Sequence, residues 1–278
     1  MDRMIEANGV ELCTETFGDS ADPPVLLIMG MGGSMLWWDE GFCRLLADGG
    51  RFVIRYDHRD TGRSVSYPPG RPPYSSDDLV ADAAGVLDAY GVGAAHVVGV
   101  SMGGALAQLL ALDFPERVAS LTLISTSPAV GSHAGLPSGS DALARFAATA
   151  SVDWSDATSV TEYLVGYSRV LAGERRFDAD ALREFVHGDI ARARDFSAAQ
   201  NHELLDDDGR VRAPLSSIAA PTLVIHGTAD PMFPLAHGEA LAAAIPGATL
   251  LPLEGAGHGV DRADWATITL AVLEHTTI

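Results

Sequence analysis

The sequence sets one serine between closely spaced glycines, in the stretch Gly99-Val100-Ser101-Met102-Gly103. Apolar residues at 94–100 predict a buried strand before it, and the apolar spacing after it predicts a helix that continues to about Phe114. Such a strand-to-helix turn strains the backbone of the serine and exposes its hydroxyl, and the glycines remove side chains that would clash. The pattern therefore predicts a nucleophile at Ser101, with an ordinary helix-capping serine as the alternative.

A serine hydroxyl is a weak nucleophile, so this chemistry also needs a base and a carboxylate that orients the base, in the order serine, acid, histidine. His258 lies in a glycine-rich loop between the last predicted strand and the last predicted helix. Asp230 follows the buried strand 220–227 and directly precedes a proline. An exposed loop histidine and a turn aspartate are the structural alternatives. The order and the loop positions favour Ser101, Asp230 and His258 as a catalytic triad.

Other candidates for the acid and the base are weaker. The other position in such folds where the orienting carboxylate can occur is the end of the predicted strand 119–126. That position offers only the hydroxyl side chains of Ser125, Thr126 and Ser127. The remaining histidines at apolar strand ends or on predicted helices are expected to be structural: His96, His226, His187, His202 and His237. Both observations strengthen the prediction that Asp230 is the acid and His258 is the base.

Acyl-transfer chemistry at a serine also needs backbone N–H groups that bind the developing oxyanion. The N–H of Met102, directly after the nucleophile, is one donor. The other is expected in the glycine-rich loop 30–34 after the strand 23–30, with Met31 as the first choice and Gly32 as the second. We therefore predict an oxyanion hole formed by the N–H groups of Met31 and Met102.

The same glycine-rich loop suggests a rival class of site, one that binds a dinucleotide. Gly30 and Gly32 match the first two glycines of G-x-G-x-x-G, and Asp57 at the end of the next strand is placed to bind a ribose. The third position of the pattern holds Met35, however, and a dinucleotide site leaves the predicted triad unexplained. We instead expect the charged stretch 55–64 around Asp57 to form a rigid turn beneath the site.

Two types of local pattern divide the chain. Strands are expected at 10–18, 23–30, 51–57, 94–100, 119–126, 220–227 and 248–255, and helices at 37–50, 75–91, 102–114, 235–245 and 262–275. This alternation predicts an α/β fold in residues 1–128 and 220–278, with a mostly parallel central sheet and helices on both faces. Residues 129–219 show only helical patterns. We predict that they form a helical cap over the ligand-binding edge of the sheet.

Composition limits the partners and the compartment. The 278 residues carry a net charge of -19, which disfavours nucleic acid and anionic membrane surfaces as partners. The two cysteines, Cys13 and Cys43, have no metal-ligand spacing, and neither a signal-peptide pattern nor an apolar run long enough to cross a membrane is present. We expect a cytoplasmic protein without a metal or cofactor, and a homodimer is left open.

The motifs GVSMGG, YDHRDTGRS, HGTADP and GAGH occur in the order typical of the α/β-hydrolases, and nearly the whole chain resembles that family. Within it, the stretches around these motifs are most similar to the bacterial methylesterases that act on anthracyclines. The resemblance implies a cofactor-independent serine esterase with Ser101 as nucleophile, Asp230 and His258 as its partners, and the N–H groups of Met31 and Met102 as the oxyanion hole. Many family members have His-Gly before the oxyanion loop, where this chain has Met29-Gly30.

The sequence therefore predicts a hydrolase that cleaves a carboxylic ester, such as a methyl ester of a bulky polyketide-like compound, and a role in antibiotic biosynthesis. Gly32, Trp37, Tyr163 and Tyr167 are the predicted substrate contacts, with packing of the aromatic residues as the alternative. Other enzymes of the same fold are alternatives: a lactonase, a carbon-carbon bond hydrolase, a proline iminopeptidase or a perhydrolase. The non-enzyme alternative is a hydrolase-like receptor for a small molecule.

Overall fold

The computed structural model describes residues 2–131, 134–205 and 210–277, and its centre is an eight-stranded sheet with the order β1-β2-β4-β3-β5-β6-β7-β8. The strands are β1 (Arg3–Ala7), β2 (Val10–Phe17), β3 (Pro24–Ile28), β4 (Phe52–Tyr56), β5 (Ala95–Val100), β6 (Val118–Ile124), β7 (Thr222–Gly227) and β8 (Thr249–Leu253). β2 pairs antiparallel with both β1 and β4, and every other pairing is parallel. The predicted mostly parallel sheet is thus confirmed.

The edge strand β1 was not predicted from the sequence. Only two of its five residues, Ile5 and Ala7, are buried, so its apolar pattern is weak. The turn that joins it to β2 contains Asn8 and Gly9, both with positive φ (47° and 73°). Asn-Gly is the preferred pair for such tight hairpins, so this dipeptide is the signal that could have identified the strand.

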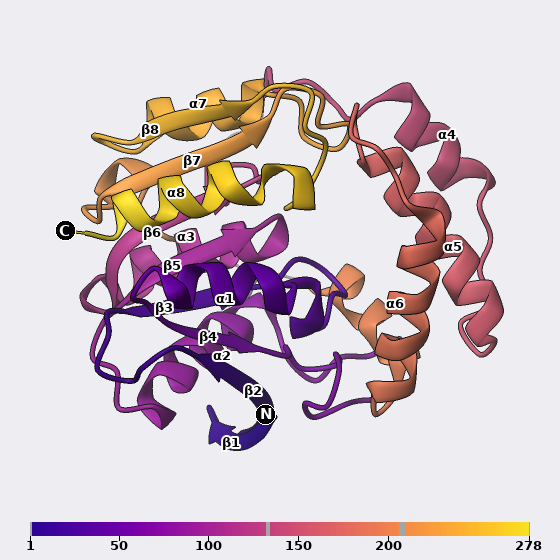
Figure 1. The fold of residues 1–278 in the computed structure, drawn as a ribbon, viewed down its shortest axis with the longest axis horizontal. Helices are drawn as coiled ribbons and strands as arrows, with labels where there is room; N and C mark the ends of the chain where they lie inside the picture. Colours follow the sequence, from indigo (N-terminus) through magenta and orange to yellow (C-terminus); the bar gives the residue numbers. More distant parts are fainter. Residues whose placement is uncertain (1, 132–133, 206–209, 278) are drawn as a thin grey trace.

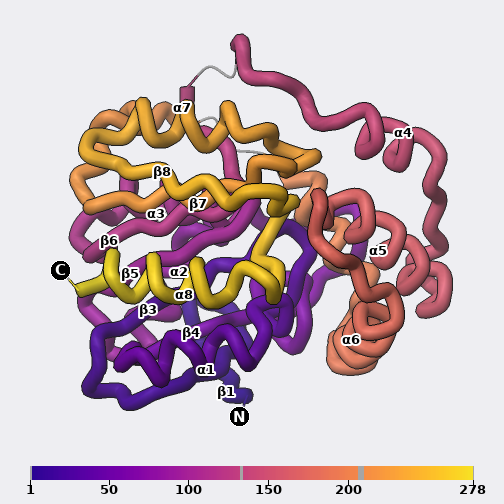
Figure 2. Tube along the Cα trace, turned by 45° about the horizontal axis from the view of Figure 1, so that its top comes forward, coloured from indigo at the N-terminus to yellow at the C-terminus, as the bar shows by residue number. Residues whose placement is uncertain are grey.

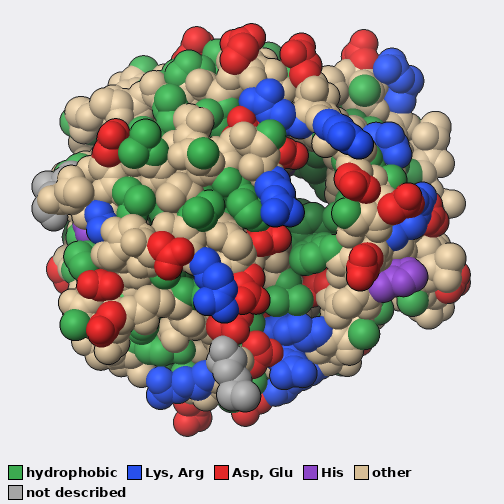
Figure 3. Space-filling view, in the orientation of Figure 1, with side chains coloured by type: hydrophobic (Ala, Val, Ile, Leu, Met, Phe, Trp, Pro, Cys, Tyr) green, Lys and Arg blue, Asp and Glu red, His purple; other side chains and the backbone are tan. Residues whose placement is uncertain are grey.

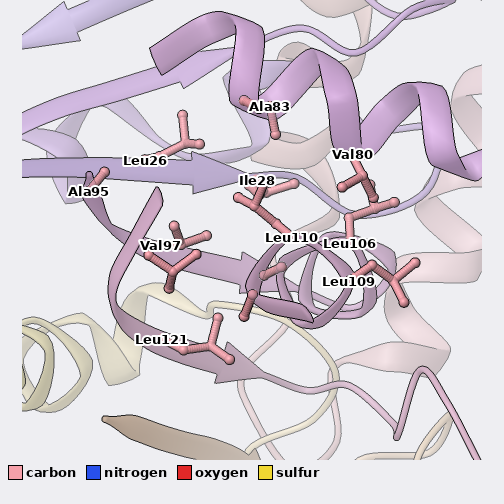
Figure 4. Packing of buried hydrophobic residues seen from close by; sticks show 14 of the residues in the cluster. Leu26, Ile28, Val80, Ala83, Ala95, Val97, Leu106, Leu109, Leu110 and Leu121 are labelled. Carbon is pink, nitrogen blue, oxygen red and sulfur yellow. The ribbon is translucent and has the colours of Figure 1, made fainter. Parts of the chain in front are cut away.

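Helices cover both faces of the sheet. α2 (Ser76–Ala89), α3 (Met102–Asp113) and α7 (Ala236–Ala244) pack on one face, and α1 (Glu40–Asp48) and α8 (Trp265–His275) pack on the other. Within β3, Leu26 and Ile28 join the first cluster, whereas Val25 and Leu27 join the second, because successive side chains of a strand point to opposite faces. Figure 4 shows the first cluster between the strands and α2 and α3.

The segment between β6 and β7 is helical. It contains α4 (Asp141–Thr149), α5 (Ala157–Leu171), α6 (Ala179–Arg192) and the 3₁₀ helices η3 (Phe196–Leu204) and η4 (Leu215–Ser217), with no strand among its described residues. Figure 1 shows α4, α5 and α6 beyond the ends of the strands at which the arrows point, and in Figure 2 the same three helices lie together on the right side of the molecule. We call residues 129–219 the helical segment, and its role as a cap domain remains a prediction.

Capping side chains set the boundaries of two helices, one of which differs from its predicted range. The helix predicted at 37–50 is a 3₁₀ turn, η1 (Met35–Trp37), followed by α1, because the Asp39 side chain accepts the Gly41 N–H and starts a new helix. Within the helical segment, α6 ends at Arg192. There Asp195 accepts the Ser197 N–H and starts η3.

Candidate active site

Ser101 occupies the turn between β5 and α3. Its φ of 54° and ψ of −122° lie outside the regions that residues with a side chain prefer, which is typical of a strained functional turn. The Ser101 N–H donates to the carbonyl oxygen of Ile124 on the neighbouring strand (3.0 Å), and the Thr126 hydroxyl donates to the Ser101 carbonyl oxygen (2.8 Å). These bonds hold the strained turn against the end of β6.

Close backbone approaches explain the glycines around the serine. A Cβ atom on Gly99 would lie 2.2 Å from the Gly103 carbonyl oxygen, and one on Gly103 would lie 2.1 Å from the Ile28 carbonyl oxygen. No larger residue fits at either position, so the motif follows from how tightly α3 packs against β3 and β5. A Cβ on Gly30 would lie 3.3 Å from the Ser101 Cβ, which places the glycine-rich loop after β3 directly beside the candidate nucleophile.

Asp230 and His258 are in direct contact. The His258 Nδ1 lies 2.9 Å from the Asp230 Oδ2, and the other carboxylate oxygen accepts the N–H groups of Met232 (2.8 Å) and Phe233 (2.9 Å). A carboxylate only accepts, so Nδ1 carries the proton and Nε2 is left as the basic nitrogen. This is the tautomer that a general base for a serine hydroxyl requires.

The environment of Asp230 favours its ionised form. Burial of the side chain opposes ionisation, but the hydrogen bond from His258 and those from the Phe233 and Met232 N–H groups outweigh burial and lower the pKa of Asp230 below its usual value. The carboxylate is therefore charged at neutral pH and can stabilise an imidazolium at His258.

The parallel strands bring the candidate triad to one edge of the sheet. Ser101 follows β5, Asp230 follows β7 and His258 follows β8, and these strands lie within the consecutive order β5-β6-β7-β8. Among the described residues, the Ser101 hydroxyl makes no hydrogen bond to His258. Such catalytic hydrogen bonds are often long without substrate and shorten when it binds.

The predicted oxyanion donors differ in availability. Met102 is the first residue of α3, so its N–H has no acceptor within the helix. In the loop after β3, the Gly32 N–H donates to His202 Nδ1 (3.0 Å) and the Gly33 N–H donates to the Gly30 carbonyl oxygen (3.3 Å). Within the described part of the chain, the Met31 N–H has no acceptor. This pattern favours Met31 over Gly32 as the second donor.

Asp57 has a structural environment that disfavours the dinucleotide alternative. Its side chain is fully buried, accepts the N–H groups of Met35 (2.8 Å) and Arg63 (2.9 Å), and forms an ion pair with Arg192 (2.7 Å). A carboxylate with these partners is not available to a ribose hydroxyl. It holds the start of η1 and the helical segment in place, as expected for a rigid turn beneath the site.

The predicted substrate contacts fall into two groups. The Trp37 Nε1 donates to the Asp189 Oδ2 (3.1 Å), and its ring meets the Phe185 ring edge-on at 5.0 Å, so Trp37 docks α6 onto the loop after β3. Tyr163 and Tyr167 stack on each other within α5, with ring centroids 6.3 Å apart. Both interactions agree with the packing alternative and leave the substrate role of these residues as a prediction.

The residues by which the helical segment binds the loops of the sheet were not predicted from the sequence. Asp189 accepts the Ser34 hydroxyl (2.6 Å), Arg192 pairs with Asp57, and His202 contacts Gly32. Their partners are more than 100 residues away in the chain, so no local pattern indicates them. The expectation that His96 and His226 are structural is confirmed, since they bond to the Ser120 hydroxyl (2.8 Å) and the Phe233 carbonyl (2.7 Å).

The described residues contain no group of three or more histidine, cysteine, aspartate or glutamate side chains arranged to hold a metal ion. None of the helices in the described ranges combines the length and the apolar character needed to cross a membrane.

The fold and this arrangement define a class of protein. The family model of the α/β hydrolase fold matches residues 23–260, and the chain belongs to this family. It is 37% identical to the rhodomycin D methylesterases of Streptomyces sp. (strain C5) and of Streptomyces peucetius, over 99% of this chain and 97% of each relative. Among solved structures, the enol-lactonase from Burkholderia xenovorans LB400 is similar, with a TM-score of 0.74, 25% identity and coverage of 99% of this chain and 100% of that one. The predicted fold class and the resemblance to methylesterases are thus confirmed.

Proposed function

We propose that this chain is a serine hydrolase that cleaves the methyl ester of a bulky, polycyclic, polyketide-like compound. Carboxylic ester hydrolysis is supported by the near full-length similarity to two methylesterases. The observation that carries the proposal is the 2.9 Å hydrogen bond between His258 and a buried, ionised Asp230, at the edge of the sheet where the strained Ser101 turn lies. A structural loop histidine does not need this tautomer or this partner.

The proposed reaction runs through an acyl-enzyme. The Ser101 hydroxyl attacks the ester carbonyl as His258 Nε2 takes its proton, and the negative oxygen is stabilised by the N–H groups of Met31 and Met102. His258 then protonates the leaving methanol oxygen as the carbon-oxygen bond breaks. A water molecule, deprotonated by the same nitrogen, attacks the acyl-enzyme and releases the acid and the free serine. This sequence needs no metal or redox cofactor.

The size of the substrate is inferred from the surroundings of the candidate triad. Figure 3 shows an opening between the α/β part and the helices α4–α6, with charged side chains on its rim and hydrophobic side chains exposed directly below it. The Met31 side chain, directly after Gly30 in the loop beside Ser101, is 52% exposed. Exposed apolar side chains near a reactive serine favour a large apolar acyl group.

A lactonase is the second candidate, because the solved enol-lactonase has the same fold over the whole chain. In a lactone the leaving alkoxide stays attached to the acyl group, so the same three residues would suffice. The ratio of kcat/KM for a bulky methyl ester to that for a lactone of similar size separates the two activities.

The direct experiment compares methyl esters of polycyclic acids, small p-nitrophenyl esters and lactones as substrates for the wild type and for Ser101→Ala. We expect the wild type to prefer the bulky methyl esters and Ser101→Ala to lose at least about 10³-fold in kcat with its fold intact. Ser138→Ala, an exposed serine outside the site, is the matched control. Near-normal turnover by Ser101→Ala would exclude the mechanism, and a preference for lactones would exclude the methyl ester.

We also propose that the protein acts in the cytoplasm, which is supported by two buried cysteines that are both free. A homodimer remains a prediction that light scattering after gel filtration would test.

A further inference from the structure

His202 lies outside the proposed triad but contacts the loop that carries the proposed oxyanion donor. It belongs to η3 of the helical segment and is only 2% exposed. Its Nδ1 accepts the Gly32 N–H (3.0 Å), and its Nε2 lies 2.8 Å from the Arg59 carbonyl oxygen. Because a carbonyl oxygen only accepts, Nε2 carries the proton and Nδ1 is the acceptor. A single neutral tautomer therefore satisfies both bonds.

The loop is also held on the other side of Met31. His58 Nε2 lies 3.0 Å from the Met29 carbonyl oxygen and donates to it. Gly32 has a φ of +69°, and a Cβ there would lie 3.8 Å from Ala199 of η3, so the helical segment packs directly on this glycine. The backbone groups before and after Met31 are thus both engaged, whereas the Met31 N–H has no acceptor among the described residues.

We propose that His202 is a positioning residue of the oxyanion hole: by accepting the Gly32 N–H, it fixes the loop so that the Met31 N–H is the donor presented to the substrate. The inference rests on the proposed ester hydrolysis. It gives the helical segment a part in the chemistry as well as in enclosing the substrate.

The environment of His202 keeps it in the form that this role requires. Burial lowers the pKa of His202 below its usual value, and the hydrogen bond to the Arg59 carbonyl and the nearby Asp60 only partly offset this effect. The imidazole is therefore neutral under ordinary assay conditions, and Nδ1 remains an acceptor. Protonation at Nδ1 would turn the acceptor into a donor facing the Gly32 N–H.

The position of η3 does not depend on His202 alone. The adjacent Asn201 donates from Nδ2 to Asp60 Oδ2 (2.8 Å) and accepts the Gly70 N–H (2.8 Å) at its amide oxygen. A substitution at position 202 therefore changes the contact with Gly32 while η3 keeps its other anchor. Asn201→Ala is the matched control, because it loosens the same helix without touching the oxyanion loop.

Two substitutions separate the two hydrogen bonds of His202. Asparagine places its amide oxygen as many bonds from Cβ as Nδ1 is, so His202→Asn keeps an acceptor for Gly32 and loses the bond to Arg59. Glutamine places its polar atoms near the position of Nε2, so His202→Gln keeps a donor for Arg59 and leaves the Gly32 N–H without its acceptor. Comparison of the two variants tests whether the contact with Gly32 or the contact with Arg59 matters for the reaction.

The experiment measures kcat and KM for a p-nitrophenyl ester, the melting temperature, and the affinity for a boronic acid, whose tetrahedral adduct with Ser101 places an oxygen in the oxyanion hole. We expect His202→Gln to lower kcat about 10- to 100-fold and to weaken boronate binding by a similar factor, with KM changed less than about threefold. His202→Asn should restore most of both losses.

Three results would overturn the inference. They are wild-type kcat and boronate affinity in His202→Gln, equal losses in His202→Gln and His202→Asn, and an equal loss in Asn201→Ala, which would indicate general loosening of η3. Failure of the proposed function is distinguishable, because then the wild type itself neither hydrolyses esters nor binds the boronate, and the inference falls with it.

Discussion

The contact between Asp230 and His258 predicts how Asp230→Asn, which replaces one carboxylate oxygen by an NH₂ group, changes the rate of catalysis. In the structure, Asp230 Oδ1 accepts two backbone N–H groups, from Met232 and Phe233, and Oδ2 accepts the proton of His258 Nδ1. In Asp230→Asn the amide oxygen must stay on the two N–H donors, because an NH₂ group there would face them directly. The NH₂ group then faces His258 and donates to Nδ1.

This reversal moves the histidine proton to the wrong nitrogen. With Nδ1 acting as an acceptor, the proton resides on Nε2, the atom that must take the proton of Ser101. We expect kcat to fall about 10⁴-fold, which corresponds to about 5.5 kcal/mol of transition-state stabilisation. The number of hydrogen bonds at the site is preserved, so we expect the free energy of unfolding to change by less than about 2 kcal/mol.

The assay is stopped-flow hydrolysis of a p-nitrophenyl ester, with urea denaturation of the same preparation and intact-mass analysis to exclude deamidation back to aspartate. The matched control is Asp261→Asn, in the loop that carries His258. Among the described residues, its side chain accepts only the Ala263 N–H (2.8 Å), and an asparagine oxygen can do the same. A loss below about tenfold in Asp230→Asn, or a comparable loss in Asp261→Asn, would refute the assigned tautomer.

Two further predictions concern stability. Arg192→Met leaves the fully buried Asp57 without its cation, so urea denaturation should show that the free energy of unfolding falls by about 3 kcal/mol. Arg194→Met, which removes a largely exposed ion pair, is the control and should lower the free energy of unfolding by less than about 1 kcal/mol. Equal losses in the two variants would contradict the role of the buried pair. Burial and the adjacent His202 lower the pKa of His58 to about 3. Between about pH 6.5 and pH 3 the unfolded chain therefore binds a proton that the folded chain does not, and the free energy of unfolding should fall by up to about 1.4 kcal/mol per pH unit as the pH decreases. His58→Gln should flatten this dependence, and an unchanged slope would contradict the assignment.

Local sequence patterns were sufficient to propose the candidate triad, of which the structure shows the contact between Asp230 and His258. Ser101 and Asp230 follow the buried strands β5 and β7, and His258 follows the edge strand β8. Parallel strands end at the same edge of the sheet, so strand prediction alone brings the three residues near one another. The glycines around Ser101 were also interpretable, since close packing of α3 against β3 leaves no space for a side chain at Gly103.

The attachment of the helical segment could not be predicted in this way. Asp189 and Arg192 lie one turn apart on α6, which suggests a common face, but their partners Ser34 and Asp57 belong to loops more than 130 residues earlier. A buried charge pattern on a helix indicates that a partner exists and does not identify it. For the same reason the contact of His202, expected to be an ordinary helix residue, with Gly32 in the loop after β3 became visible only in the structure.

Trp37 illustrates a similar limit for the substrate contacts. It is one of the predicted substrate contacts, and the structure places its indole N–H on Asp189 and its ring on Phe185. An aromatic side chain near a site can serve packing or binding, and composition does not distinguish these roles.

Formation of an ester intermediate on Ser101 is the most direct test of the account. Rapid acid quench of the wild type with a p-nitrophenyl ester, followed by intact-mass and peptide analysis, should show a burst of p-nitrophenol and one acyl group on the peptide that contains Ser101. His258→Ala should abolish the adduct under the same conditions. Ester turnover with an acyl group on another residue, or an adduct that forms equally well in His258→Ala, would contradict the central claim.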